Sequence, residues 1–163
     1  LIKTFKDKQH KNQGSKMIKA LMALLVGMIA TFIVDFFIFL GVWLHYIKPN
    51  EIEVFYNVLF ADHQNPLIFL GSSVIIGFII IFIENKKLSI LTIISLTILA
   101  ILPLFEPIGR YTGEALLMKK GVTYNNKRFT FHGDVYYDGR KSITFYDNEL
   151  KKMIILNKKD LIR

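Results

Sequence analysis

The feature that most constrains this chain is an apolar run at residues 17–47, which is interrupted by Lys19, Asp35 and His45. A helix crosses the hydrocarbon core of a bilayer with about 20 residues, so this run can span a membrane with tilt or protrude beyond it. The run extends well past the apolar part of a signal peptide, and no small-residue cleavage pattern follows it. We therefore expect an uncleaved anchor, with Trp43, His45 and Tyr46 at the membrane interface.

Two further apolar runs follow, separated by the short polar turn Glu84–Lys87. The mean hydropathy is +0.38, and the apolar residues are concentrated between residues 17 and 108. Each of Pro103 and Pro107 removes a backbone donor, so they are expected to kink or end the last run. The pattern predicts a basic arm at 1–16 and a transmembrane domain at 17–120, with three transmembrane helices at about 18–47, 67–84 and 88–108.

The remaining segment, residues 121–163, is predicted to form a small antiparallel β module, which makes the chain α+β overall. Apolar and polar side chains alternate at 127–132 and at 141–145, as is typical of strands. Asp138-Gly139 predicts a two-residue hairpin, and a further strand is expected at 153–156. A tail of about 50 residues is marginal for an independent core, so we expect it to lean on the helices, on a partner or on copies of itself.

Charge predicts the topology. The net charge is +8. Residues 1–19 contain six lysines and one acidic residue, whereas the loop at 48–66 is net negative. The positive-inside bias places the N-terminus in the cytoplasm and, after three crossings, the tail on the periplasmic or extracytoplasmic side. The abundance of Ile, Lys, Asn and Phe favours a bacterial chain in the cytoplasmic (inner) membrane.

Asp35 is the most informative single residue, because an ionised carboxylate within a membrane helix costs on the order of 3 kcal/mol. It continues a stripe of small and polar residues, spaced four apart, that would face another helix: Ala23, Gly27 and Thr31. Two interpretations remain open. Asp35 either handles protons or cations in a conduction path, or it is a packed carboxylate that fixes helix association.

The second apolar run offers partners for this stripe. Ser72 and Ser73 are expected at a depth comparable to that of Asp35, as hydrogen-bond partners of a protonated carboxyl group. Gly71 and Gly77 add small positions that favour close helix packing, with a pore lining as the minor alternative. At the end of the third run, Glu106 and Arg110 are spaced for an i,i+4 ion pair at the interface.

The tail interleaves aromatic and basic side chains, a pattern that can bind single-stranded nucleic acid. An extracytoplasmic tail argues against nucleic acid, so we interpret alternate aromatics as core and the basic residues as solvated. The same residues would form a docking surface for lipid head groups, an anionic envelope polymer or an acidic partner: Lys127, Arg128, Tyr136, Arg140 and Lys141.

No catalytic motif is present, neither a nucleophile elbow nor a glycine-rich phosphate loop. The absence of cysteine excludes disulfides and thiolate sites. The four histidines lack metal-binding spacing, so we expect no metal and no cofactor. A minor alternative is a membrane enzyme, or a metal or haem site, that uses His45, Asp62 and His63 at the outer surface.

These features lead to a non-enzymatic integral membrane protein. We expect it to act as an accessory, scaffold or assembly subunit of an envelope complex through its β tail, with the bilayer and other membrane subunits, or itself, as partners. The alternative is a homo-oligomeric channel or ion-coupled transporter that uses Asp35.

Overall fold

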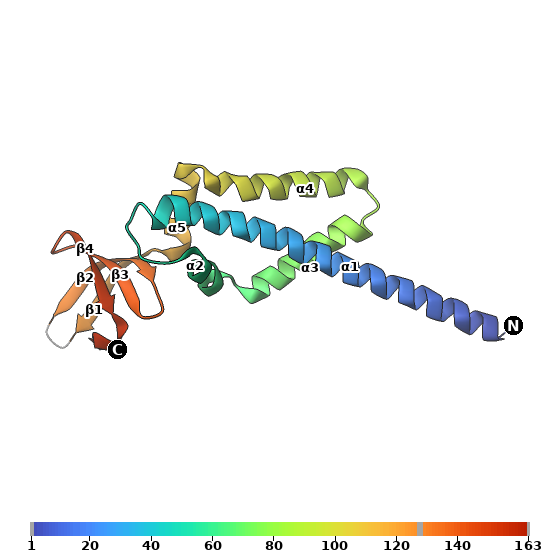
Figure 1. The fold of residues 1–163 in the computed structure, drawn as a ribbon, viewed down its shortest axis with the longest axis horizontal. Helices are drawn as coiled ribbons and strands as arrows, with labels where there is room; N and C mark the ends of the chain where they lie inside the picture. Colours follow the sequence, from blue (N-terminus) through green and yellow to red (C-terminus); the bar gives the residue numbers. More distant parts are fainter. Residues whose placement is uncertain (1, 127–128, 163) are drawn as a thin grey trace. The chain divides into compact units, whose positions relative to one another are not determined.

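The computed structural model describes residues 2–126 and 129–162, and its chain is α+β, with helices followed by a small antiparallel sheet (Figure 1). The chain separates into two compact units. One contains residues 1–38 and 60–101, and the other contains residues 39–59 and 102–163. The division therefore cuts the first helix near Ile38, whereas the sequence placed the boundary at residue 121.

Helix α1 (Ile2–Val42) has 41 residues and continues directly into a π-helical turn, η1 (Trp43–Ile47). At 1.5 Å per residue α1 is about 60 Å long, roughly twice the thickness of a hydrocarbon core. The part from Gly14 to Ile47 is long and apolar enough to cross a membrane. Residues 2–16 of the expected basic arm are thus helical and continuous with the first apolar run.

The next helices are α2 (Tyr56–His63) and α3 (Pro66–Phe82). Asn65 caps α3, because its side chain accepts hydrogen bonds from the backbone N–H groups of Leu67 (3.0 Å) and Ile68 (3.3 Å). Pro66 in the first turn then fixes the start of the helix. This cap also separates α3 from α2, and the two helices are bent by 80°.

Helix α4 (Lys86–Ile101) is followed by a 3₁₀ turn, η2 (Leu102–Leu104), and by α5 (Glu106–Leu117). The segment expected as one span at 88–108 is therefore divided. Pro103 lies in the 3₁₀ turn, Phe105 is extended (φ −84°, ψ 131°), and Pro107 falls in the first turn of α5. Each proline lacks the donor that a continuous helix requires, so the helix breaks between them.

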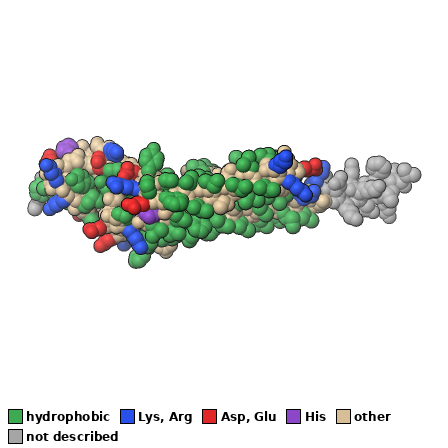
Figure 2. All heavy atoms as spheres, turned by 90° about the horizontal axis from the view of Figure 1, so that it is seen from above, with side chains coloured by type: hydrophobic (Ala, Val, Ile, Leu, Met, Phe, Trp, Pro, Cys, Tyr) green, Lys and Arg blue, Asp and Glu red, His purple; other side chains and the backbone are tan. Residues whose placement is uncertain are grey.

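Two helices within the described residues can cross a membrane, Gly14–Ile47 and Lys86–Leu104, or three if α2 and α3 form one broken span. Their surfaces are apolar: Met17 is 72% exposed and Leu67 is 82% exposed. Figure 2 shows hydrophobic side chains covering the visible face of the helices. Lipid is the solvent that suits such a surface, because soluble monomers rarely expose large contiguous apolar areas.

The sheet has the order β4-β3-β2-β1-β5 and every pairing is antiparallel. Its strands are β1 (Lys119–Asn126), β2 (Thr130–Asp138), β3 (Ser142–Asp147), β4 (Lys152–Asn157) and the two-residue β5 (Leu161–Ile162). Alternation puts one set of apolar side chains on a shared face, where they form the core: Val135, Ile143, Phe145 and Leu156.

Helical segments of the second unit pack against this sheet. The Tyr46 ring stacks on Tyr136, with centroids 6.3 Å apart and planes 14° apart. The Tyr46 hydroxyl also donates a hydrogen bond of 2.9 Å to the Tyr136 carbonyl. Gly113 of α5 lies directly against the Tyr46 ring, where any Cβ would clash. The β module is thus joined to the end of the first span and to α5.

Candidate functional site

Helices α1 and α3 meet through small residues in the first unit. A Cβ on Gly27 would collide with the Ser73 backbone, and a Cβ on Gly77 would collide with the Ala23 backbone. Glycine at these two positions therefore allows the helix backbones to touch, which is how small residues stabilise helix pairs in lipid. Gly71 differs, because nothing lies within 4 Å of its Cβ position, so it belongs to an open face.

A buried pair of hydroxyl groups lies in the same seam. Ser73 is fully buried and Thr31 is 4% exposed. The Ser73 hydroxyl lies 3.2 Å from Thr31 Oγ1 and 2.7 Å from the Phe69 carbonyl, to which it donates. Ser73 is thus bonded to its own helix and to α1, and it is not the partner of Asp35. Ser72, the next residue along the turn, is half-buried.

The partner of Asp35 comes from the connection between α2 and α3. Gln64 Nε2 donates a hydrogen bond of 3.0 Å to Asp35 Oδ2, and both residues are half-buried. An amide can donate to either protonation state of a carboxyl group, so this contact satisfies the polar atom without a second charge. Gln64 was not predicted as this partner, because it lies 29 residues from Asp35 in a loop and no periodicity marks it.

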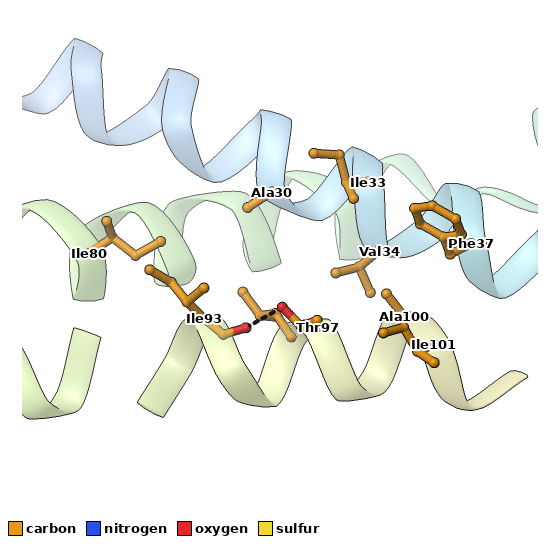
Figure 3. Close-up of a pocket in the computed structure, with 10 residues that line it drawn as sticks. Ala30, Ile33, Val34, Phe37, Ile80, Ile93, Thr97, Ala100 and Ile101 are labelled. Atoms are coloured by element: carbon orange, nitrogen blue, oxygen red, sulfur yellow. Dashed lines mark hydrogen bonds between the residues drawn. The ribbon is translucent and has the colours of Figure 1, made fainter. Parts of the chain in front are cut away.

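An apolar pocket of about 330 Å³ lies between α1 and α4, with Ile80 of α3 at one side (Figure 3). The single hydroxyl in its lining belongs to Thr97, and it donates a 2.9 Å hydrogen bond to the Ile93 carbonyl of its own helix. The pocket therefore offers hydrocarbon contacts and no unsatisfied hydroxyl. The other lining residues are Ala30, Ile33, Val34, Phe37, Leu96, Ala100 and Ile101.

A second close helix contact lies in the other unit, at the start of α5. Gly109 lies against the Pro103 carbonyl and the Gly41 carbonyl, and a Cβ there would also reach His45. His45 Nε2 is 2.8 Å from the Leu104 carbonyl. The helix break leaves this carbonyl without a helical N–H partner, and the histidine side chain satisfies it. The sequence analysis missed this junction, although Gly109 and Gly113 form a G-x-x-x-G pattern that could have indicated it.

Arg110 has a different partner from the one expected. Its Nε lies 3.2 Å from Glu114 Oε1, one turn further along α5, whereas the sequence analysis paired it with Glu106. Both spacings are i,i+4, so spacing alone could not choose between them. The Arg110 side chain is 69% exposed, and such an exposed pair contributes little to stability.

The residues of the expected docking surface lie in different surroundings. Tyr136 packs against Tyr46 and, at 6.4 Å between centroids, against Tyr146. Arg140 and Lys141 are exposed in the connection between β2 and β3. Lys127 and Arg128 lie outside the described residues.

A groove of about 220 Å³ opens on the sheet face that carries Tyr137, Thr144 and Ile155. The segment that precedes α2 supplies its other wall with Glu53 and Val54, and Val58 of α2 completes that wall. Ile155 is 65% exposed, which is unusual for an isoleucine on a strand. The groove therefore combines apolar contacts with one acid, Glu53, and one base, Arg140.

Asp138 joins the two ends of the sheet module. Lys119 Nζ lies 3.2 Å from Asp138 Oδ2, and Lys158 pairs with the other carboxylate oxygen. Partial burial alone would raise the pKa of Asp138. The hydrogen bonds and charges of Lys158 and Lys119 outweigh that effect and hold the pKa below its ordinary value of 3.8.

The described residues contain no cluster of three or more His, Asp or Glu side chains that could hold a metal ion. Asp35 meets the side-chain amide of Gln64 and His45 meets the Leu104 carbonyl, and both of these partners are neutral groups. Such an arrangement can fix helices and loops in place. Comparisons of the chain with protein-family models, with curated proteins and with solved structures found no match.

Proposed function

We propose that this chain is a non-enzymatic, multi-pass membrane subunit that anchors a larger envelope complex and docks it through the β module. The main support for the proposal is that β4 forms an open edge of the sheet. Within the described residues β4 pairs with β3 alone, and it presents the exposed Ile155 beside a groove. An edge strand with an exposed apolar side chain is a surface that readily pairs with another chain.

The polar groups of the helices support the same proposal. Thr31, Ser73 and Asp35 bond to hydroxyl, carbonyl and amide groups of α1, α3 and the loop before α3. These contacts hold the helices together and suit a rigid anchor. By the charge bias of the sequence, the anchor would lie in the bacterial cytoplasmic membrane with its N-terminus in the cytoplasm and its β module outside.

The alternative function, a homo-oligomeric channel or ion-coupled transporter, depends on Asp35. A proton relay is usually a chain of ionisable groups, and the contact that Asp35 makes is with the neutral Gln64. The geometry therefore favours the anchor over the relay.

Site-specific photo-crosslinking in native membranes tests the proposal. A photoreactive residue would replace Lys141 or Tyr146 in the β module, and the matched control would replace Ile98, which is 52% exposed on α4. We expect the positions in the module to yield one discrete product of higher mass that contains a second protein, and Ile98 to yield mainly lipid adducts. If the module gave only uncrosslinked monomer, the docking role would be refuted.

A further inference from the structure

The register of α1 and α3 brings exposed lysines of the first unit to one end of its helices. Gly27 lies against Ser73, and Ala23, four residues earlier, lies against Gly77, four residues later. The two helices are therefore antiparallel, and the same register places the end of α3 and the turn after it level with residues 16–19 of α1. Helix α4 begins directly after that turn. The exposed lysines on these segments are Lys16, Lys19, Lys86 and Lys87.

This end of the unit is net positive. Glu84, in the turn, is the acidic residue among the four lysines, and residues 1–13 add four more lysines and one aspartate in sequence. The end of α3 and the start of α4 present opposite helix dipoles to the turn, so the lysines set its charge. Figure 2 shows lysine or arginine side chains gathered where the apolar surface of the helices ends.

The acids of the helices lie at the opposite end. Asp35 bonds to Gln64 just before α3, and Asp62 lies in the last turn of α2. The described part of this unit thus carries its lysines at one end and its two aspartates at the other. Lysines gathered beside apolar helices attract anionic lipids.

The apolar pocket between α1 and α4 forms a groove on the same helices. Val34 and Ala100 are buried in its floor, whereas Ile93 at its rim is 50% exposed. Figure 3 shows side chains of α1 and α4 facing each other along it. Ile93 follows Lys86 by seven residues and Ile101 follows it by fifteen. At 1.5 Å per residue the α1–α4 groove therefore covers depths of about 10 to 22 Å from Lys86.

That range of depth matches one leaflet of a bilayer. The hydrocarbon core is about 30 Å thick and the bilayer with its head groups about 40–45 Å, so one leaflet extends about 20–22 Å from head group to midplane. With Lys86 at the level of the head groups, the groove lies beside the acyl chains of the same leaflet and ends near the midplane.

The α1–α4 groove is too narrow for another helix. Its volume of about 330 Å³, spread over about 12 Å, gives a mean cross-section of about 27 Å². A helix about 10 Å in diameter has a cross-section of about 80 Å². A single acyl chain is much narrower, because its carbon atoms need a contact distance of only about 3.5–4.0 Å on each side. The lining also suits hydrocarbon, since its one hydroxyl, that of Thr97, is bonded to the Ile93 carbonyl.

We propose that this chain binds an anionic phospholipid, whose head group lies among Lys16, Lys19, Lys86 and Lys87 and one of whose acyl chains fills the α1–α4 groove. This inference rests on the membrane location in the proposed function and is independent of docking through the β module. The lysine ammonium groups would donate charge-assisted hydrogen bonds to the lipid phosphate. The groove would select a lipid over a free phosphate.

Native mass spectrometry of the full chain, released from uncharged detergent micelles, tests the head group. The micelles contain phosphatidylglycerol or phosphatidylcholine with the same acyl chains at the same mole fraction. We expect phosphatidylglycerol to bind about fivefold or more tightly than phosphatidylcholine, since one lysine near an anionic lipid contributes about that factor. Glycerol phosphate carries the charge without acyl chains and should not be retained.

A pair of double variants locates the head group. Lys86→Gln with Lys87→Gln should lower the affinity for phosphatidylglycerol by about tenfold or more and leave phosphatidylcholine binding unchanged. Lys151→Gln with Lys152→Gln makes the same change of charge at exposed lysines of the β module. This control should leave the affinity for both lipids as it is.

A second pair of variants locates the acyl chain. Thr97→Phe fills the groove and should weaken phosphatidylglycerol binding by about tenfold, whereas Leu99→Phe, at a residue of α4 that is 49% exposed and outside the groove lining, should not. A phosphatidylglycerol with a photoreactive group in its acyl chain should label residues 30–37 and 93–101 of the natural chain. This labelling would still test the groove if Thr97→Phe did not fold.

Equal retention of the two lipids, or labelling spread evenly over the exposed faces of the helices, would overturn the inference. A dimer of the chain that Thr97→Phe dissociates would also overturn it, in favour of a second copy at the groove. These outcomes leave the docking function untouched, because the crosslinked partner is sought on the β module. A chain that stayed monodisperse without detergent would instead remove both the lipid site and the membrane function.

Discussion

Gln64 donates a hydrogen bond to Asp35 across 3.0 Å and thereby ties the connection between α2 and α3 to the apolar part of α1, which is long enough to cross a membrane. A half-buried carboxyl group in a membrane helix needs such a partner, because lipid cannot solvate it. The partner is neutral, so the contact stabilises the helices in either protonation state of Asp35. If Asp35 has a structural role, loss of this hydrogen bond should lower stability, and that can be tested directly.

A double-mutant cycle on Asp35 and Gln64 should give a coupling of about 0.6 kcal/mol, the average for hydrogen bonds between membrane helices, and at most about 1.7 kcal/mol. The cycle compares Asp35→Ala, Gln64→Ala and the double variant by thermal unfolding in micelles. Asp35→Asn should retain most of the stability, since an asparagine oxygen still accepts from Gln64. If Asp35→Asn abolished ion flux through reconstituted vesicles, the transporter alternative would replace the anchor.

Gly27→Val should separate α1 from α3, because the added side chain meets the Ser73 backbone. Overpacking of this kind costs about 1–3 kcal/mol. The chain has no cysteine, so Thr31→Cys with Ser73→Cys supplies a clean reporter, given that the two native hydroxyl oxygens are 3.2 Å apart. Gly27→Val should greatly reduce the disulfide yield of that pair. Gly71→Val is the matched control on an open face, and an equal loss there would refute the packing argument.

The β module shows what period-2 alternation can predict and where it fails. The strand at 153–156 was expected, and in the turn before it Asp147 Oδ1 accepts from the N–H groups of Glu149 (2.8 Å) and Leu150 (2.9 Å). The alternating stretch at 127–132, by contrast, was expected to end at His132, yet β2 runs on through Gly133 to Asp138. The Tyr146 carbonyl approaches Gly133 so closely that a Cβ would not fit, and a sequence does not reveal such an approach.

The hairpin between β2 and β3 was predicted at the right place with the wrong turn. Neither Asp138 nor Gly139 has the positive φ that a type I′ turn requires, and the Gly139 N–H donates to the Ser142 carbonyl over 3.0 Å. The turn therefore lies two residues further along, at Arg140 and Lys141. Asp138 is instead drawn into its pairing with Lys119 and Lys158, which are distant in sequence.

The positions of the helices could be predicted from the length of the apolar runs, whereas the tertiary contacts between distant segments could not. The apolar runs located all three long helices, because crossing a bilayer sets a minimum length. The bounds of α3 were right to within two residues, whereas α1 begins 16 residues before the expected start at 18 and α4 ends seven residues before the expected end at 108. The partner of Asp35 and the junction of His45 with Leu104 both join segments far apart in the chain. Local periodicity carries no information about such pairs, so the candidate site was only half predictable.

Tyr46→Phe should weaken the attachment of the β module to the helices by about 0.5–1.5 kcal/mol, the usual net contribution of one hydrogen bond. The substitution removes the hydroxyl that donates to the Tyr136 carbonyl and leaves the stacked ring in place. Hydrogen exchange of the β2 amides would report the change. Tyr111→Phe, at a tyrosine that is 73% exposed, is the control and should have no effect on these amides.

The Asp138 cluster should make the stability of the β module depend on pH in the acid range. The pKa of Asp138 is lowered in the folded chain, because Lys158 and Lys119 stabilise its charged form more than burial disfavours it. A lowered pKa means that the unfolded chain takes up a proton first. The stabilisation is therefore complete above the ordinary value of 3.8 and is lost as the pH falls through the lower folded pKa.

Asp138→Asn should destabilise the module at neutral pH, and its difference in stability from the natural chain should shrink below about pH 4. Thermal unfolding followed between acid and neutral pH would measure this, with Asp160→Asn as an exposed control. A difference between Asp138→Asn and the natural chain that stayed constant with pH would show that the two lysines do not set the charge state of Asp138.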